Sequence, residues 1–183
     1  MNPPLANVHR NPRFHGDCLA RSGVTLADRL RARIEADGPM PFEEWMEACL
    51  YDPEDGYSMQ ARQKTGTSLE ADFATSPKLH PFLAQCVARE ALDLWETLGR
   101  PANFQVAEFG GGEGDLARDA TAWLQANSRL APEWLHIEIS PDHRDKQEGA
   151  HVTTLPDGFT GLVVAHEFVD ALPFQVLRRT EAG

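Results

Sequence analysis

A glycine-rich segment between an apolar run and a helical pattern constrains this chain more than any other feature. Residues 106–116 read VAEFGGGEGDL, with glycine at positions 110, 111, 112 and 114. Glycine lets the backbone turn sharply and lets a ligand approach the main chain without a Cβ in the way. A glycine loop where a strand gives way to a helix is typical of the first βα unit of a ligand-binding α/β sheet. A glycine-rich surface turn is the alternative interpretation.

Beyond residue 100 the apolar pattern alternates between short strands and helices. This order predicts a parallel sheet with helices on its faces, which is an α/β fold. The expected strands are 104–109, 134–139, 151–155 and 161–168, with a further one starting at 174–178, and the expected helices are 115–130 and 141–147.

Residues 23–99 are predicted to be largely helical. Thr25 can cap a helix of about three turns that Gly38-Pro39 ends, and Pro41 suits the first turn of a second helix. The remaining expected elements are a loop or short hairpin at 52–76, a turn at 76–80 and a helix from Pro81 to Gly99.

Composition narrows the classes of partner. The chain has 183 residues with 17 Lys and Arg against 28 Asp and Glu, a formal net charge of −11. This balance argues against nucleic acid or an anionic membrane as the main partner, because phosphate binding needs clustered basic residues. No apolar run approaches the roughly 18 residues of a membrane span, so we expect a soluble domain.

The N-terminal residues and the cysteines bear on the cellular compartment of the protein. Residues 1–39 hold six Arg against four acids, as a mitochondrial transit segment does, but Pro3, Pro4 and Pro12 interrupt an amphipathic helix. We predict a disordered tail at 1–22 and a cytoplasmic protein, or a matrix protein if the source is eukaryotic. The widely spaced cysteines 18, 49 and 86 indicate neither a disulfide framework nor a zinc site, and we expect no metal.

The residues around the glycine loop distinguish between nucleotide-like ligands. Asp115 stands where a P-loop has Lys and where a dinucleotide fingerprint has its third Gly. Because Glu108, Glu113 and Asp115 surround the loop, we expect a cationic ligand. S-adenosyl-L-methionine carries a sulfonium and an ammonium group. Glu108 would face the ammonium, and the N–H groups at the helix N-terminus would take the carboxylate.

Acids also follow two other expected strands. Glu138, after the second strand, can accept hydrogen bonds from both ribose hydroxyls, or it can simply cap the next helix. Glu167 and Asp170 follow the fourth strand, where paired carboxylates can hold and partly deprotonate a guanidinium or an amine. Asp170 could instead cap a turn before Pro173. The N/D-Pro-Pro-Tyr/Phe motif, which amino-group methyltransferases of bases and of glutamine use, is missing.

Four segments carry a family pattern: GPMP at 38–41 through LYDPEDGY at 50–57, DFATSP at 72–77, EFGGGEG at 108–114 and HEFVDALP at 166–173. In this order they resemble the MidA-type proteins, which are class I S-adenosylmethionine-dependent methyltransferases. A mitochondrial member of that family methylates an arginine of a respiratory complex I subunit during assembly. The glycine loop is shared by many methyltransferases, whereas the other three segments are specific to the family.

The resemblance implies a Rossmann-like class I methyltransferase sheet, incomplete at about four to five strands, in residues 100–183. A helical lid region at 23–99 would precede it. The residues implied to bind the cofactor are Glu108, Gly110, Gly112, Gly114, Glu138, Asp72, Phe73, Thr75, Ser76 and His166, and those implied at the substrate side are Glu167 and Asp170. Four departures are Ala71 for Gly, Lys78 for Glu, His166 for the commoner Asn, although the mitochondrial branch also has His, and a length short of the family's.

The predicted function is methylation of a protein arginine, with a respiratory complex subunit as the substrate. A non-catalytic assembly factor that keeps the cofactor fold is one alternative. An NAD-dependent enzyme, disfavoured by Asp115, is another. An open sheet edge would allow a homo-oligomer, and we expect the fragment itself to transfer no methyl group.

Overall fold

The computed structural model describes residues 23–60 and 75–179. The chain divides into two compact units, Met1–Gly38 and Pro39–Gly183. The predicted tail at 1–22 lies outside the described residues.

In the first unit, helix α1 (Leu26–Asp37) begins with a capping box, in which Asp28 N donates to the Thr25 hydroxyl and Thr25 N donates to the Asp28 carboxylate. Gly38 ends the helix, as predicted.

The second unit begins with helices. Pro41 precedes the first of them, and Pro81 precedes the longest, so both predicted starts are confirmed. No hairpin occurs in 52–60, where the chain forms a turn and a 3-10 helix, and residues 61–74 of that predicted segment are not described. The elements are α2 (Phe42–Tyr51), η2 (Tyr57–Met59), α3 (Ser76–Leu79) and α4 (Phe82–Thr97).

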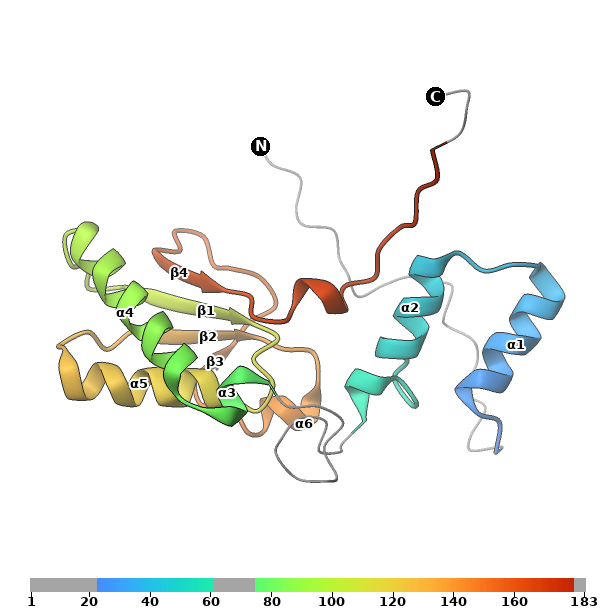
Figure 1. Cartoon of the computed structure of the whole chain (residues 1–183), viewed down its shortest axis with the longest axis horizontal. Coiled ribbons are helices and arrows are strands. Elements are labelled where there is room, and N and C mark those ends of the chain that lie inside the picture. The colour runs from blue at the N-terminus through green and yellow to red at the C-terminus, as the bar shows by residue number, and fades with distance from the viewer. Residues whose placement is uncertain (1–22, 61–74, 180–183) are drawn as a thin grey trace. The chain divides into compact units, whose positions relative to one another are not determined.

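The rest of the second unit is a parallel sheet with its connecting helices (Figure 1). The strand order is β3-β2-β1-β4, and every described strand pair is parallel, as the βαβ pattern predicts. The elements are β1 (Gln105–Phe109), α5 (Asp115–Asn127), β2 (Glu133–Ile137), α6 (Pro141–Arg144), β3 (Ala150–His151), β4 (Gly161–Val164) and the 3-10 helix η3 (Val169–Ala171).

Helices α4 and α5 lie side by side on one face of the sheet (Figure 1). Their contact is made by small side chains, because α4 buries Ala84, Ala88 and Ala91, and α5 buries Ala117 and Ala120. Small residues let helix axes approach closely. Larger side chains from α5, the strands and the loops complete this core: Phe104, Val106, Leu116, Leu124, Leu130 and Trp134. The core thereby fixes the start of α5 against the ends of β1 and β2.

Several predicted bounds change. Helix α5 ends at Asn127, three residues early, and α6 is a single turn. The predicted strand at 174–178 is wrong, because residues 173–179 are irregular. A strand needs a neighbour for its backbone groups, and no described strand lies beyond β4. Phe174 packs on Phe42 instead, with ring centroids 5.1 Å apart, and Leu177 is 87% exposed. No helix among the described residues is long and apolar enough to span a membrane.

Candidate functional site

The glycine loop, residues 110–114, connects β1 to α5. Gly110, Gly112 and Gly114 have φ angles of 65°, 56° and 80°, which favour glycine, and Gly114 caps the N-terminus of α5. Gly110 N donates to Ile137 O at 3.0 Å, so the loop is tied to the end of β2. Among the described residues, no atom lies within 4 Å of a Cβ built on Gly112. The main chain at Gly112 is therefore open to an approaching ligand, as the sequence predicts.

Glu108 lies in β1 directly before the loop, and it is only 3% exposed. Its Oε2 atom lies 3.3 Å from His136 Nδ1 but has no well-aligned hydrogen bond among the described residues. A Cβ on Gly111 would lie 2.6 Å from the same oxygen. The absent side chain at Gly111 thus makes room for the Glu108 carboxylate beneath the loop.

His136 is a site residue that the sequence analysis missed. It is fully buried in β2, directly opposite Glu108 in the parallel register, and its Nε2 lies 2.9 Å from Glu148 O. Burial on its own lowers the pKa of His136, but the Glu108 carboxylate and the Glu148 carbonyl raise it above its usual value. The signal was available, because a histidine two residues before Glu138 shares its face of the strand.

Glu138 follows β2 and is buried beside the glycine loop. Its Oε1 accepts from Ser140 N at 2.9 Å and its Oε2 accepts from Gly112 N at 3.3 Å. Burial raises the pKa of this carboxyl, but His143, Ser140 and Gly112 together lower it below its usual value. The carboxylate therefore caps the following turn and also contacts the loop, so the two interpretations of Glu138 are compatible. Each carboxylate oxygen can still accept a further hydrogen bond.

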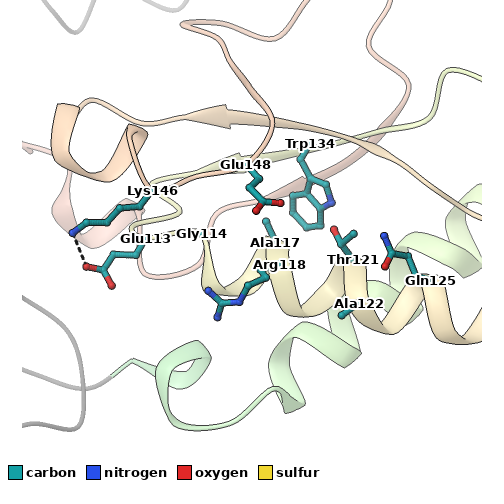
Figure 2. Close-up of a pocket in the computed structure, with 10 residues that line it drawn as sticks. All are labelled: Glu113, Gly114, Ala117, Arg118, Thr121, Ala122, Gln125, Trp134, Lys146 and Glu148. Carbon is teal, nitrogen blue, oxygen red and sulfur yellow. Dashed lines mark hydrogen bonds and ion pairs between the residues drawn. The ribbon is translucent and has the colours of Figure 1, made fainter.

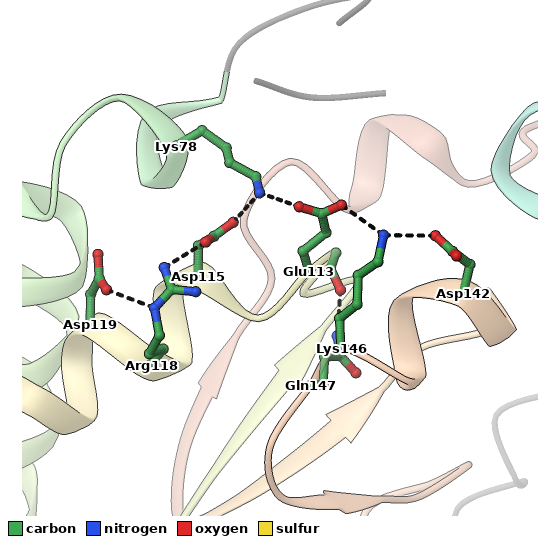
Figure 3. Close-up of polar contacts among 9 residues, drawn as sticks. Lys78, Glu113, Asp115, Arg118, Asp119, Asp142, Lys146 and Gln147 are labelled. Carbon is green, nitrogen blue, oxygen red and sulfur yellow. Dashed lines mark hydrogen bonds and ion pairs between the residues drawn. The ribbon is translucent and has the colours of Figure 1, made fainter. Parts of the chain in front are cut away.

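Glu113 and Asp115, two of the acids from which a cationic ligand was expected, are paired with basic side chains. Lys78 Nζ contacts Glu113 and lies 2.6 Å from Asp115 Oδ2, Lys146 Nζ lies 2.9 Å from Glu113 Oε1, and Arg118 pairs with Asp115 (Figure 3). The hydrogen bond from Lys78 is the main cause that lowers the pKa of Glu113 to about 2. The argument for a cationic ligand therefore depends on Glu108 and Glu138 alone.

Removing the Lys78 side chain tests this ion-pair cluster. The pairs are largely shielded from solvent, so Lys78→Met should lower the free energy of unfolding by about 1–2 kcal/mol in urea titrations. Because the pKa of Glu113 is depressed from 4.5 to about 2, its contribution is present above about pH 4.5 and is lost as the pH falls toward 2. Lys78→Met should weaken that acid dependence.

The matched control is Arg89→Ala, which breaks an exposed i,i+4 pair with Asp93 and should cost less than about 0.5 kcal/mol. Equal effects in both variants would contradict this assignment.

Thr75 and Ser76 lie at the start of α3, the helix whose Lys78 belongs to this ion-pair cluster. Thr75 precedes α3 and Ser76 begins it, while Lys78 in the same helix contacts the start of α5. Asp72 and Phe73, predicted from the same segment, lie outside the described residues.

The turn after β4 carries His166, Glu167 and Asp170. The two carboxylates are exposed, Glu167 has a φ of 50°, and His166 Nε2 lies 3.9 Å from Glu167 Oε1. Phe168, which lies between the two acids, reaches the glycine loop: a Cβ on Gly110 would lie 2.8 Å from its ring. The turn therefore lies beside the loop, at the carboxyl end of the sheet.

Tyr51 connects this turn to α2. Its hydroxyl donates to Ala171 O at 2.6 Å. Burial, and then the charges of Glu138 and Asp170, raise the pKa of the phenol. Tyr51 thus lies near Glu138 of the predicted cofactor site and near Asp170 of the predicted substrate side, although the sequence analysis gave it no role.

A cavity of about 350 Å³ lies between α5, Trp134 of β2 and the segment before β3 that carries Lys146 and Glu148 (Figure 2). Its lining includes Trp134, Thr121, Gln125 and Glu148, and it shares Glu113 and Gly114 with the glycine loop. Glu108, Gly112 and Glu138 are not part of the lining, so this cavity is not the predicted ligand site. Among residues 23–60 and 75–179, no group of three or more His, Cys, Asp or Glu side chains could hold a metal ion.

These features define a class of protein. A glycine loop after β1, an acid after β2 and a parallel sheet with β1 in its interior are the arrangement of a Rossmann-like domain that binds a nucleoside-containing cofactor.

Comparisons with known proteins assign the family. Residues 86–183 match a family model described as "Putative S-adenosyl-L-methionine-dependent methyltransferase". The chain belongs to this family, which confirms the resemblance to MidA-type methyltransferases.

Individual relatives cover most of the chain. It is 34% identical to a Drosophila melanogaster protein named "Protein arginine methyltransferase NDUFAF7 homolog, mitochondrial", over 84% of this chain and 42% of the relative. It is 26% identical to the Xenopus tropicalis protein named "Protein arginine methyltransferase NDUFAF7, mitochondrial", over 88% of this chain and 45% of the relative. A crystal structure of a Burkholderia thailandensis protein, described as a "likely methyl transferase" and bound to S-adenosyl-homocysteine, matches with a TM-score of 0.65 and 32% identity, over 75% of this chain and 39% of that one. The chain spans less than half the length of these relatives.

Proposed function

We propose that this chain is the cofactor-binding part of a class I methyltransferase and that it binds S-adenosyl-L-methionine at the glycine loop. One observation carries the proposal: the open main chain at Gly112 lies between two buried acids, Glu108 from β1 and Glu138 from β2. The S-adenosyl-homocysteine bound in the Burkholderia structure supports the same ligand class.

The residues present fit such a cofactor. Glu138 has the capacity to accept hydrogen bonds from two ribose hydroxyls. Glu108 offers a buried oxygen without an aligned donor, which suits an ammonium group. The N-terminus of α5 favours the carboxylate of the amino-acid moiety. Further contacts are proposed for Gly110, Gly114, Asp72, Phe73, Thr75, Ser76 and His166.

A ligand panel tests the cofactor assignment. S-adenosyl-L-methionine and S-adenosyl-homocysteine should each raise the melting temperature of the purified chain in proportion to the logarithm of their concentration, because they bind the folded state. NAD⁺, matched in concentration, should leave the melting temperature unchanged. Stabilisation by NAD⁺ alone would instead support the dehydrogenase alternative.

The proposed reaction is methylation of a protein arginine. The cofactor, when bound, supplies a methyl group on a positively charged sulfur. Glu167 and Asp170 would orient the guanidinium and accept the proton that the nitrogen loses as the new C–N bond forms.

The names of the Drosophila and Xenopus relatives support a protein arginine as the substrate. The resemblance to the MidA-type family supports a respiratory complex subunit as the partner. The word mitochondrial in the relatives' names supports the mitochondrial matrix for a eukaryotic source, with the cytoplasm as the bacterial counterpart.

The acids after β4 can be tested in a full-length relative that has the same HEFVDALP segment. Replacing the glutamate that corresponds to Glu167 with Gln should lower the rate of methyl transfer at least about tenfold, while cofactor affinity stays within a few-fold. The corresponding Asp93→Asn on the exposed side of α4 is the control and should change neither quantity. Equal loss of rate and affinity would place Glu167 in the cofactor site. A bound cofactor with no transfer to any partner by the unmodified relative would favour the non-catalytic assembly factor.

The β4 edge provides a surface for self-association. Among the described strands, β4 pairs only with β1, and Val163 on it is 47% exposed. An unpaired edge with apolar side chains favours pairing between copies. Sedimentation should therefore show concentration-dependent dimers, which Val163→Lys reduces and Val176→Lys, in the irregular segment after η3, does not. A chain that stays monomeric at every concentration would exclude this association.

A further inference from the structure

A buried histidine and a buried carboxylate face each other beneath the glycine loop. His136 is 0% exposed and Glu108 is 3% exposed, and they occupy paired positions in β2 and β1. We propose that His136 is a positioning residue of the cofactor site: it holds Glu108 as a carboxylate under the loop and so sets the affinity for the ammonium group of the ligand. This inference deepens the proposed function and rests on it.

The partners of the two ring nitrogens favour the protonated, charged form of His136. His136 Nε2 lies 2.9 Å from the carbonyl oxygen of Glu148, and a carbonyl can only accept, so Nε2 carries a proton. The other ring nitrogen, Nδ1, lies 3.3 Å from Glu108 Oε2. A neutral ring would point a lone pair at the carboxylate, whereas an imidazolium places a positively charged N–H group 3.3 Å from Glu108 Oε2, as an ion pair that is not aligned as a hydrogen bond.

The surrounding groups favour the same charge state. Glu108 faces the ring from β1, Glu138 follows the end of β2, and the Glu148 carbonyl approaches from the segment before β3. His151 of β3 lies with its ring centroid 5.7 Å away and has its own pKa lowered, by burial first and then by His136. The net surroundings of His136 are negative, and they raise its pKa in spite of its burial.

Glu108 has no other cation near enough to stabilise it among the described residues. Lys78, Lys146 and Arg118, the cations around the loop, pair with Glu113, Asp115, Asp119 and Asp142. A buried carboxylate without a cationic partner tends to take up a proton and become neutral. Loss of the His136 charge would therefore remove the negative charge beneath the loop.

The geometry also couples the pair to the loop itself. The same Oε2 atom that faces His136 fills the space below Gly111, where a Cβ would lie 2.6 Å away. If His136 were removed, Glu108 would lose the group that fixes its orientation. The position of the loop main chain between Gly110 and Gly112 would then be less well defined.

The decisive experiment compares two ligands that differ in the amino-acid moiety. S-adenosyl-homocysteine carries an ammonium group, whereas 5′-methylthioadenosine has the adenosine part and lacks it. In calorimetric titrations of the purified chain, His136→Gln should lower the affinity for S-adenosyl-homocysteine at least about tenfold. It should lower the affinity for 5′-methylthioadenosine less than about twofold. His151→Gln, which removes the neighbouring exposed histidine of β3, is the matched control and should change neither affinity.

A double-mutant cycle shows whether His136 acts through Glu108. Glu108→Gln should weaken S-adenosyl-homocysteine by a similar factor, and adding His136→Gln to it should cause little further loss. Additive losses would overturn the proposal, as would equal losses for both ligands. Binding of neither ligand by the unmodified chain would instead contradict the proposed function, and the inference would fall with it.

Nitrogen NMR of the unmodified chain gives a readout that does not depend on a variant that folds. At pH 7 we expect both ring nitrogens of His136 to show the chemical shifts of a protonated imidazolium, while His151 is neutral. A neutral His136 with a single proton on Nε2 at this pH would overturn the proposal, even if His136→Gln were too unstable to study.

Discussion

Gly112→Val should abolish measurable binding of S-adenosyl-homocysteine to this chain, with a loss of affinity of at least about 100-fold. Position 112 has a φ of 56°, and a Cβ there would point into open space beside the loop main chain, where the ligand is proposed to lie. A branched side chain would occupy that space and would also strain the backbone by about 1–3 kcal/mol. Calorimetric titration of the purified variant measures the effect.

The control for Gly112→Val separates occupied space from backbone strain. Gly99, which follows α4, has a φ of 80° and likewise has nothing within 4 Å of a built Cβ. Gly99→Val should lower the melting temperature by a similar amount and leave the affinity unchanged. Unaltered affinity in a folded Gly112→Val protein would show that the ligand does not approach this loop.

Gly161→Ala should be among the most destabilising single substitutions in the chain, with a loss of more than about 3 kcal/mol in the free energy of unfolding. A Cβ at this position would overlap the carbonyl oxygen of Gln105, the residue that pairs with Gly161 at the start of β4. The clash is with backbone, so relief requires β4 to move away from β1. That movement would also break the hydrogen bond from Gln105 N to Thr160 O.

Urea unfolding with Gly158→Ala as the reference tests this assignment. Gly158 lies three residues earlier with a φ of 76°, but a Cβ there would meet nothing within 4 Å. Its substitution should cost about 1 kcal/mol from backbone conformation alone. Equal unfolding midpoints for Gly158→Ala and Gly161→Ala would contradict the close β1–β4 approach.

The order of strands and helices, the glycine loop and the place of Glu138 could all be predicted from sequence. They depend on local patterns, because apolar periodicity, helix caps and glycine act over a few residues. The carboxyl ends of parallel strands share one edge, and so Glu108 and Glu138 meet at the loop although they are 30 positions apart.

The electrostatic partners could not be predicted in this way. Lys78 reaches Glu113 and Asp115 through the docking of α3 on α5, a tertiary contact with no local signature. Because Lys78 pairs with these two acids, Glu113 and Asp115 do not support the expectation of a cationic ligand. The strand expected at 174–178 failed for a related reason, because its apolar alternation indicates a strand only where another strand is present to pair with it.

The central claim is that the glycine loop between Glu108 and Glu138 is a binding site for S-adenosyl-L-methionine. The most direct measurement is a titration of the ¹⁵N-labelled chain with S-adenosyl-homocysteine, followed by amide NMR. The largest shifts should fall on Gly110, Gly112, Gly114 and the residues around Glu138, with saturation at one equivalent. Saturable shifts confined to Thr121, Gln125 and Glu148 in the α5 cavity, or no shifts at all, would contradict it.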